Sequence, residues 1–349
     1  MTFSNKKMIE NKIIKKYKIK NGKKKGEKIY LFIELIIKIC IIMMASPQCL
    51  KLYFFFNKYH YCNNCVKNIK HLSAKCHKCP NEFLFRKLYI ESEENTLNEI
   101  IKHNKSISRY GDGEFLIIFK RGISFQNYFQ ELAKRLLEIL NSHDKNLLVG
   151  IYYPYKAKDL KPYIPGHISY WKAFTNGVKF HFFQIIKQDK KFYSAGISRF
   201  YFKFKDKSIS KRLLSKFRQI WGGRDVLIIE GEISKLGVGN DLFNNTNSIK
   251  RIICPEKNSF RVYNKILKTA LNFEQNNLIL ISLGPTATVL AYDLSKLGYQ
   301  ALDIGHIDRE YELMIKKEKR WIFKGEKKPD VSGKEMIKYK NQIKYKILK

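Results

Sequence analysis

The sequence has 349 residues, of which 44% are hydrophobic, and it carries a formal net charge of +36 at pH 7. A chain of this length and apolar content can bury the core of one large α/β domain and still carry an appendage. Its seven cysteines, an odd number in a long chain, argue against a disulfide scaffold and indicate a reducing compartment.

The positive charge is concentrated at the two ends of the chain. Lys and Arg outnumber Asp and Glu by 20 to 4 in residues 1–90 and by 13 to 4 in residues 316–349. Such an excess suits proteins that bind nucleic acid or an anionic membrane. Because the excess lies at the ends, we interpret it first as solvated extensions. Peripheral contact with an anionic membrane is the alternative, and nucleic acid is the less favoured partner.

The N-terminal extension, which we place at residues 1–90, contains two unlike segments. Residues 5–28 are lysine-rich and are expected to be disordered or bound to a surface. Residues 29–45 are strongly apolar, but their length is at the short limit for a membrane span, and Glu34 and Lys38 lie inside. We therefore predict a buried or interfacial helix rather than a span. This favours a cytoplasmic protein, with association with the inner membrane face as an option.

The same extension carries two pairs of cysteines. Cys62 and Cys65 form one Cys-x2-Cys pair, and Cys76 and Cys79 form the other. Four thiolates can surround Zn²⁺ as a tetrahedron, the geometry of closed structural sites. The separation between the pairs is short for a zinc ribbon, so unpaired cysteines in a flexible basic segment are the alternative. We predict a small structural zinc knuckle.

From residue 91 onward, apolar strand patterns alternate with helical ones. This alternation predicts an α/β fold with a doubly wound, mainly parallel sheet. The predicted strands are residues 147–151, 191–195, 225–230, 249–254, 278–283 and 301–304. The predicted helices are residues 91–105, 123–141, 209–220, 259–271, 286–297 and 308–317. We place this domain at residues 91–318 and a basic tail at residues 319–349.

Two carboxylates stand one residue apart in the sequence Ser-Arg-Tyr-Gly-Asp-Gly-Glu-Phe, residues 108–115. We predict a turn between strands at 106–108 and 115–119, which would carry Asp112 and Glu114 beyond the sheet edge. Two hard oxygen ligands on such a turn suit Mg²⁺ or Mn²⁺ held together with a diphosphate. The alternative is a plain hairpin, because Asp-Gly between apolar runs is a strong hairpin signal.

Polar residues also cluster after four of the predicted strands, where ligands of doubly wound sheets bind. They are Arg199 after 191–195; Glu230, Glu232, Gly237, Gly239, Asn240 and Asp241 after 225–230; Thr286 after 278–283; and Asp303 and His306 after 301–304. Thr286 opens a helix whose free N–H groups favour an anion. Arg199 can clamp phosphate, and His306 can act as a general base. Ordinary turns, helix caps and surface residues are the alternative reading of each cluster.

Taken together and in order, several of these blocks carry a family resemblance. From Ser106 to about Glu312 the chain resembles the GT-D-type glycosyltransferases. The resemblance rests on Arg109-Tyr110-Gly111-Asp112-Gly113-Glu114, on Ile229-Glu230-Gly231-Glu232, on Leu236-Gly237-Val238-Gly239-Asn240-Asp241-Leu242-Phe243, on Arg251-Ile252-Ile253-Cys254-Pro255, on Leu283-Gly284-Pro285-Thr286-Ala287-Thr288, and on Asp303-Ile304-Gly305-His306-Ile307-Asp308. It implies a Rossmann-like fold and transfer of a sugar, typically glucose from UDP-glucose, onto a glycan of a cell-surface glycoprotein. It also implies a divalent-metal site at Asp112 and Glu114.

We therefore expect a metal-dependent glycosyltransferase in which Asp112 and Glu114 hold Mn²⁺ or Mg²⁺ against a UDP-sugar. The residues expected to bind the donor are Arg109, Gly111, Arg199, Glu230, Gly237, Gly239, Asn240, Asp241, Thr286 and Asp303. The acceptor hydroxyl could be deprotonated by Glu230, Glu232, Asp303 or His306, and the sequence leaves this choice open. The aromatic segment 152–170 is a candidate platform for the acceptor glycan, with simple packing as its alternative.

A binding protein is the rival interpretation. In that case the α/β domain binds a nucleotide without transferring a sugar. The basic ends and the zinc knuckle then engage nucleic acid or an anionic membrane. Steep weakening by salt would favour this rival, whereas dependence on Mn²⁺ would favour the enzyme.

Overall fold

A computed structural model describes residues 88–152, 161–168, 170–171, 185–187, 190–318 and 342–347. All of them belong to one of the two compact units of the chain. The lysine-rich run, the apolar segment 29–45 and the cysteines between Cys62 and Cys79 lie outside the described residues, so their predictions stay predictions. Within the described ranges, no helix is long and apolar enough to cross a membrane.

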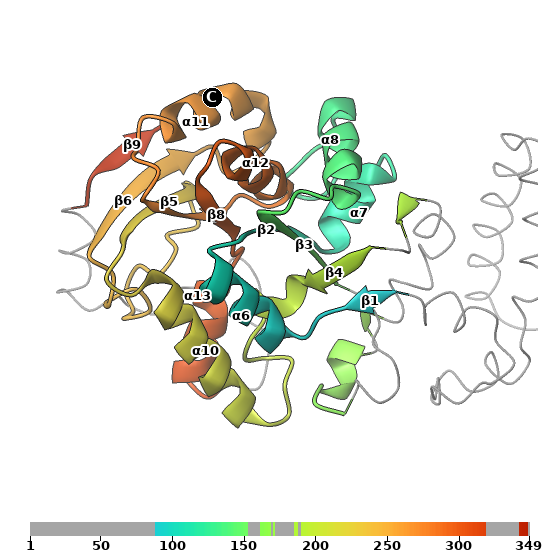
Figure 1. Ribbon diagram of the computed structural model, residues 1–349, viewed down its shortest axis with the longest axis vertical. Coiled ribbons are helices and arrows are strands. Elements are labelled where there is room, and N and C mark those ends of the chain that lie inside the picture. Colours follow the sequence, from blue (N-terminus) through green and yellow to red (C-terminus); the bar gives the residue numbers. More distant parts are fainter. Residues whose placement is uncertain are drawn as a thin grey trace, which may run out of the picture. The chain divides into compact units, whose positions relative to one another are not determined.

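The described domain is built on one sheet of nine parallel strands, in the order β1-β4-β3-β2-β8-β7-β5-β6-β9 (Figure 1). The strands are β1 Tyr89–Ile90, β2 Ser106–Tyr110, β3 Leu147–Ile151, β4 Lys191–Ser194, β5 Asp225–Gly231, β6 Ser248–Cys254, β7 Leu278–Ser282, β8 Gln300–Asp303 and β9 Lys344–Lys346. A parallel sheet with helices on both faces confirms the predicted fold class.

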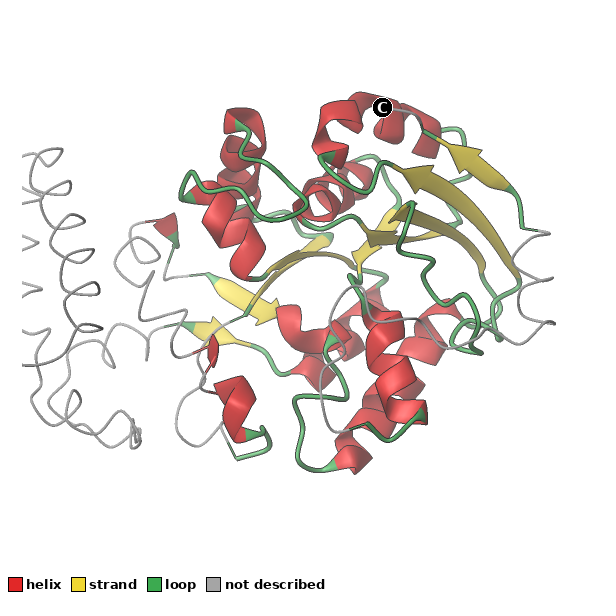
Figure 2. Cartoon of the chain, turned by 180° about the vertical axis from the view of Figure 1, so that it is seen from behind, coloured by secondary structure: helices red, strands yellow, loops and turns green. Residues whose placement is uncertain are grey.

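Helices cover both faces of the sheet, as Figures 1 and 2 show from opposite sides. On one face lie α6 (Glu93–His103), α10 (Lys207–Trp221) and α13 (Ile307–Ile315). The other face carries α7 (Asp112–Ile118), α8 (Gln130–Leu140), α11 (Tyr263–Ala270) and α12 (Pro285–Lys296). Two short 3-10 turns, η3 (Ala195–Ser198) and η4 (Ser259–Val262), follow β4 and precede α11.

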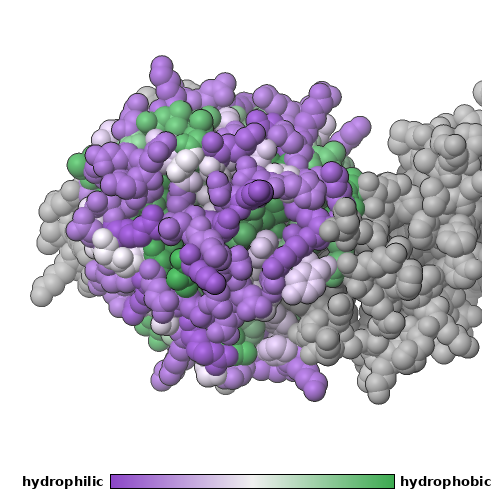
Figure 3. Space-filling view, in the orientation of Figure 1, coloured by the Kyte–Doolittle hydropathy of each residue, from purple (hydrophilic) through white to green (hydrophobic). Residues whose placement is uncertain are grey.

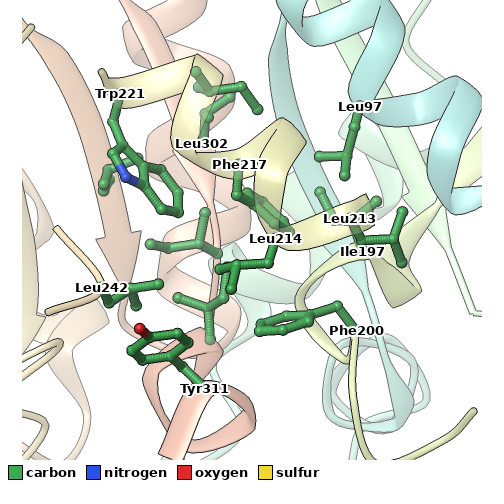
Figure 4. Packing of buried hydrophobic residues seen from close by; sticks show 14 of the residues in the cluster. Leu97, Ile197, Phe200, Leu213, Leu214, Phe217, Trp221, Leu242, Leu302 and Tyr311 are labelled. Carbon is green, nitrogen blue, oxygen red and sulfur yellow. The ribbon is translucent and has the colours of Figure 1, made fainter. Parts of the chain in front are cut away.

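The core explains why the central strands read as continuous apolar runs. Every residue of β3 and β7 is buried, because helices exclude water from both sides. On the α10 face, one buried cluster joins Phe217 and Trp221 of α10 to Leu242, Leu302 and Tyr311 (Figure 4). The face visible in Figure 3 is mainly hydrophilic, with separate small apolar areas. Most of the apolar residues therefore lie in the two interfaces between the helices and the sheet.

Two local predictions were wrong. Residues 115–118 of the predicted strand 115–119 belong to α7, and Phe119 is its C-cap, so the Asp-Gly sequence opens a helix and is not a hairpin turn. The helix predicted from residue 123 begins only at Gln130. In addition, part of the predicted basic tail adds β9 to the sheet edge next to β6, a strand that was not predicted. All three residues of β9 are exposed, so no apolar pattern marks this strand in the sequence.

The connections after β2 and β8 leave to opposite faces of the sheet, which makes these neighbouring strands a topological switch point. After β2 the chain turns into α7, which packs on the α8 and α12 face. After β8 it turns into α13, which packs on the opposite face. Neighbouring parallel strands whose connections leave to opposite faces open a ligand crevice beyond their carboxyl ends. Asp303 is the last residue of β8, and Asp112 follows the end of β2 by two residues, so both lie where such a crevice is expected.

Candidate active site

The Arg109 side chain ties together three chain segments at this crevice. Its Nη1 donates to Ser198 Oγ at 2.6 Å and to the Ala195 carbonyl at 3.0 Å, both on η3. Its Nε donates to the Asp303 carbonyl at 2.5 Å, and Nη2 donates to Asp303 Oδ1 at 2.8 Å. A side chain at Gly305 would meet Nη2 at 2.5 Å, and this residue has φ +49°. This contact is consistent with the prediction that Arg109 and Asp303 belong to one site. The two side chains already pair with each other, however, which leaves them less available to a ligand.

Asp112 and Glu114 occupy the first turn of α7, behind the N-cap Gly111. Glu114 folds back, so that its Oε2 accepts a hydrogen bond from Gly111 N at 2.7 Å. Asp112 Oδ2 accepts a hydrogen bond from the Tyr170 hydroxyl at 2.5 Å. The Glu114 carboxylate is also stabilised by the N–H of its own backbone, in addition to that of Gly111. Residues i and i+2 of a helix do not face each other, so the backward fold of Glu114 sets how close the two carboxylates come.

Two carboxyls at this site, those of Glu114 and Asp303, have raised pKa values. Burial, helped by the charges of Asp303 and Asp112, raises the pKa of Glu114 to about 7, against the effect of its bond to Gly111. Burial also raises the pKa of Asp303, although the Arg109 guanidinium opposes this. A carboxyl that is reluctant to ionise beside other carboxyls favours an added cation.

Arg199 supplies a further positive charge from the residue after η3. It is partly exposed, and its Nη1 lies 3.8 Å from Oε1 of the buried Glu310. Glu310 in turn accepts hydrogen bonds from Tyr201 N and Phe202 N, both at 2.8 Å, which fixes this segment to α13. Burial and the bond to Asp112 raise the pKa of Tyr170, and the charge of Arg199 opposes this rise. Arg199 therefore acts on the same neighbourhood as Asp112.

The start of α12 borders the same crevice from the β7 side. Thr288 Oγ1 donates to the Arg109 carbonyl at 3.0 Å, and Ser108 Oγ donates to the Thr288 carbonyl at 2.7 Å, so α12 is fixed to β2. Pro285 is the first helical residue. Thr286 Oγ1 is buried and has no hydrogen-bond partner among the described groups. A buried hydroxyl without a partner at a helix start can form a hydrogen bond with a ligand.

The segment between α7 and α8 contacts the starts of both α7 and α12, and the sequence analysis did not single it out. A side chain at Gly113 would meet the Ile123 side chain at 3.2 Å. One at Gly284 would meet the Phe125 ring at 2.4 Å. Asn258 N donates to the Phe125 carbonyl at 2.9 Å and holds the segment in place. The helical spacing of the apolar residues from Phe129 onward led to a helix being predicted over these residues as well, so the contacts of Ile123 and Phe125 went unrecognised.

Residues 107–328 match the family model described as the Glycosyltransferase GT-D fold. The chain belongs to this family. The resemblance found in the motifs is thereby confirmed.

Curated relatives agree with this assignment. Glycosyltransferase GlyD of Streptococcus pneumoniae serotype 4 is 39% identical over 227 residues, which are 65% of this chain and 28% of that protein. The probable glycosyl transferase Gly of Streptococcus gordonii is also 39% identical over 227 residues, 65% of this chain and 33% of its own length. The match thus spans about a third or less of these relatives.

Solved structures show the same fold. A domain of unknown function 1792, described as having a distinct glycosyltransferase fold, is 33% identical with a TM-score of 0.66. The likeness covers 77% of this chain and 94% of that one. A glycosyltransferase of the same domain type from Streptococcus sanguinis is 33% identical with a TM-score of 0.65, covering 75% of this chain and 96% of that one.

Within this GT-D fold, the acids after β5 lie apart from Asp112. In the sheet β5 is the third strand from β2, which corresponds to roughly 14 Å. Glu230 is buried and ion-paired with Arg251, and it accepts a hydrogen bond from Leu236 N at 2.6 Å. Glu232 is exposed, and its Oε1 lies 3.0 Å from Lys346 Nζ. By contrast, His306 is the N-cap residue of α13, directly after β8, which neighbours β2.

The glycine-rich segment after Glu232 has structural reasons for its composition. Gly237 and Gly239 have φ of +68° and +90°, which favours glycine. Asp241 accepts a hydrogen bond from the Tyr311 hydroxyl at 2.6 Å and one from Arg218 at 3.3 Å. Asn240 Oδ1 accepts from Leu242 N at 3.1 Å, while its buried Nδ2 has no partner among the described groups. Donor binding by these four residues stays a prediction.

The predicted donor set for a divalent cation consists of Asp112 and Glu114, and it stays a prediction. The described part of the chain contains no group of three or more His, Cys, Asp or Glu side chains that could enclose an ion. Mg²⁺ sites commonly use one or two carboxylates and take their remaining ligands from substrate phosphates and water. Two carboxylates in one helical turn fit a cation of this kind, with substrate and water as its other ligands.

Proposed function

We propose that this chain transfers glucose from UDP-glucose to a hydroxyl of a glycan or glycoprotein acceptor, with Mn²⁺ or Mg²⁺ at Asp112 and Glu114. The observation that carries the proposal is the acidic first turn of α7, at the β2–β8 crevice and between two positive features. One feature is Arg199, and the other is the start of α12. A nucleotide diphosphate combines negative charge with metal affinity, and it suits this arrangement.

The residues of the chain have distinct roles in this proposal. Asp112 and Glu114 hold the cation, which would neutralise charge on the departing UDP. The first turn of α12 and Arg199 bind the diphosphate oxygens. Arg109 touches no ligand in this scheme, because its donors are used by Asp303, Ser198 and the Ala195 carbonyl. It is a positioning residue that keeps the ends of β2 and β8 in register with η3.

His306 is the best-placed candidate for the base that deprotonates the acceptor. It follows the strand next to β2, whereas Glu232 follows a strand three positions away. The Asp303 carboxylate is ion-paired with Arg109 and that of Glu230 with Arg251, so protein groups occupy both of them and neither is placed to take a proton from an acceptor. Replacing His306 with alanine should lower kcat by about 10²–10⁴-fold, the usual contribution of such a base. An unchanged kcat would remove His306 from the mechanism.

The deciding experiment measures release of UDP from UDP-glucose with and without Mn²⁺. The variants are Asp112→Asn and Glu114→Gln, which remove charge but keep shape. Glu138→Gln is the control, because Glu138 is an exposed acid of α8 that pairs with Arg135. We expect metal-dependent release that is lost in both site variants and kept in the control. UDP release that persists in both site variants would refute the metal site. If neither the wild type nor any variant released a nucleotide from any nucleotide sugar, the donor class would be refuted.

A further inference from the structure

One side chain at the mouth of the site has no role in the scheme above. Tyr170 is 51% exposed, which is unusual for a tyrosine beside a buried cluster. Its hydroxyl donates to Asp112 Oδ2 at 2.5 Å, so one end of the side chain lies at the proposed donor site. Its ring meets the Trp171 ring edge-on, with centroids 5.5 Å apart and planes at 85°.

The rings behind Tyr170 form a stack. Trp171 is 7% exposed and lies flat on the Tyr152 ring, at 4.1 Å between centroids and 9° between planes. The Tyr152 hydroxyl and His167 Nε2 are hydrogen-bonded at 2.9 Å. His167 stacks on Tyr163 at 5.6 Å. Tyr170 is therefore the exposed end of a chain of aromatic contacts, which we call the aromatic wall: Tyr152, Tyr163, His167, Tyr170 and Trp171.

A buried ion pair anchors the wall. Lys203 Nζ is bonded to Glu93, and the Tyr163 hydroxyl donates to both oxygens of Glu93, at 3.1 and 3.2 Å. The same ammonium lies 5.4 Å from the centre of the Tyr152 ring and 5.3 Å from that of Tyr163. Lys203 also donates to the carbonyl of Gly196 in η3, the turn to which Arg109 donates two hydrogen bonds. The wall and the donor site thus share one support.

The wall carries no charge that would change near neutral pH. Burial, with help from the charges of Lys203 and Arg199, lowers the pKa of His167 to about 3. The imidazole is therefore neutral and can serve as a partner for the Tyr152 hydroxyl. An uncharged, rigid aromatic surface that ends in a half-open ring suits a neutral, amphipathic ligand better than an ion.

We propose that Tyr170 is the stacking platform for the acceptor sugar, and that Trp171 and Tyr152 hold its ring in place. The inference rests on the proposed function. The C–H groups of a pyranose face carry partial positive charge, and they meet the negative face of an aromatic ring. A sugar stacked on Tyr170 would lie beside Asp112, where the donor's anomeric carbon would be attacked. The competing ligand for the ring is the uracil of the donor, which the experiment separates.

The test compares Tyr170→Ala and Tyr170→Phe with Tyr89→Ala. Tyr89 is a similarly exposed tyrosine, 56% open, and it pairs with Lys191 at the amino end of β4, away from the site. Methyl glucoside and methyl N-acetylglucosaminide are the acceptor probes. We measure the acceptor KM, the KM for UDP-glucose, and the rate of UDP-glucose hydrolysis without acceptor. Saturation-transfer NMR with the same glycosides reports binding without turnover.

For Tyr170→Ala we expect the acceptor KM to rise by about tenfold, the size of one aromatic contact, while hydrolysis and donor KM match those of Tyr170→Phe, which also lacks the hydroxyl bond to Asp112. Tyr170→Phe keeps the ring and should keep the acceptor KM, and Tyr89→Ala should match the wild type. An unchanged acceptor KM in Tyr170→Ala, or a rise in donor KM instead, overturns the proposal. So does the absence of glycoside binding to the wild type in NMR. Glycoside binding that depends on Tyr170, without turnover of any nucleotide sugar, would instead refute the proposed donor.

Discussion

Arg109 and Asp303 are joined by two hydrogen bonds, at 2.5 and 2.8 Å, across the crevice between β2 and β8. One bond goes to the carbonyl of Asp303 and one to its carboxylate, so the guanidinium fixes both the strand end and the side chain. The neighbouring Gly305 leaves the space that the guanidinium needs. Arg109 thus holds the ends of β2 and β8 together, although the sequence analysis predicted that it binds the donor.

Replacing Arg109 with lysine should lower the free energy of unfolding by about 1–3 kcal/mol, because lysine cannot make the planar set of contacts and leaves Asp303 poorly satisfied. Urea unfolding measures the change. Arg218→Lys is the control, because Arg218 is more exposed and pairs with Asp241 near the surface, where we expect about 0–1 kcal/mol. Equal losses in the two variants would mean that the Arg109 contacts are no stronger than surface pairs.

The raised pKa of Glu114 predicts a pH dependence of stability. The folded-state pKa is about 7 and the ordinary value is 4.5, so the unfolded chain ionises first. The stabilisation that protonated Glu114 gives the folded state is therefore fully present below about pH 4.5, and it is lost as the pH rises through about 7. In metal-free buffer, Glu114→Gln should remove this loss and gain about 1–3 kcal/mol over the wild type between pH 5 and pH 8. Parallel stability curves for the two proteins would show that Glu114 titrates normally.

Sequence reasoning found the elements that bury apolar residues on both sides. The runs at β5 and β7 and the amphipathic pattern of α10 each have a strong physical signal, and each was placed to within a few residues. It failed where the signal is weak. β9 is fully exposed and lysine-rich, so its place at the sheet edge depends on pairing with β6 rather than on its own side chains.

The site was only partly predictable for a related reason. Parallel strands bring their carboxyl ends to one edge, so Arg109, Asp303 and the start of α12 could be placed near one another from the sequence, and they are in contact. Distances between strands that are not neighbours in sequence were unknown, so Glu232 and His306 could not be ranked. The contact of Tyr170 with Asp112 joins residues 58 positions apart, and only the aromatic composition of that segment pointed to it.

Glu230 is predicted to stabilise the fold rather than to perform chemistry. It is fully buried and paired with Arg251, and removing one member of such a pair leaves a buried charge. Glu230→Ala should therefore lower the free energy of unfolding by about 3–5 kcal/mol. The double change Glu230→Leu with Arg251→Met should recover much of this loss. For comparison, Glu232→Ala should cost at most about 0.5 kcal/mol, because Glu232 is exposed.

Thermal or urea unfolding of these variants separates the two acids. If Glu230→Ala were as stable as Glu232→Ala, the ion pair would contribute nothing measurable. Failure of the double change to recover stability would mean that the hydrogen bond to Leu236 N, rather than the charge balance, is what matters.

Gly284 is predicted to tolerate no side chain, because two effects act there at once. Its φ of +55° strains any other residue, and an added Cβ would meet the Phe125 ring at 2.4 Å. Gly223 is a matched control, since its φ is +68° and nothing lies within 4 Å of an added Cβ. Gly223→Ala should cost about 1 kcal/mol from strain alone. Gly284→Ala should cost about 1–3 kcal/mol more from overpacking.

The double variant Gly284→Ala with Phe125→Ala distinguishes the two causes at Gly284. It removes the steric conflict and leaves the strain, so the coupling between the two changes should be favourable by about 1 kcal/mol or more. Urea unfolding of the two single variants and the double variant gives this coupling directly. Additive losses would show that Phe125 does not press on the start of α12, and that the segment between α7 and α8 is free to lift from the proposed donor site.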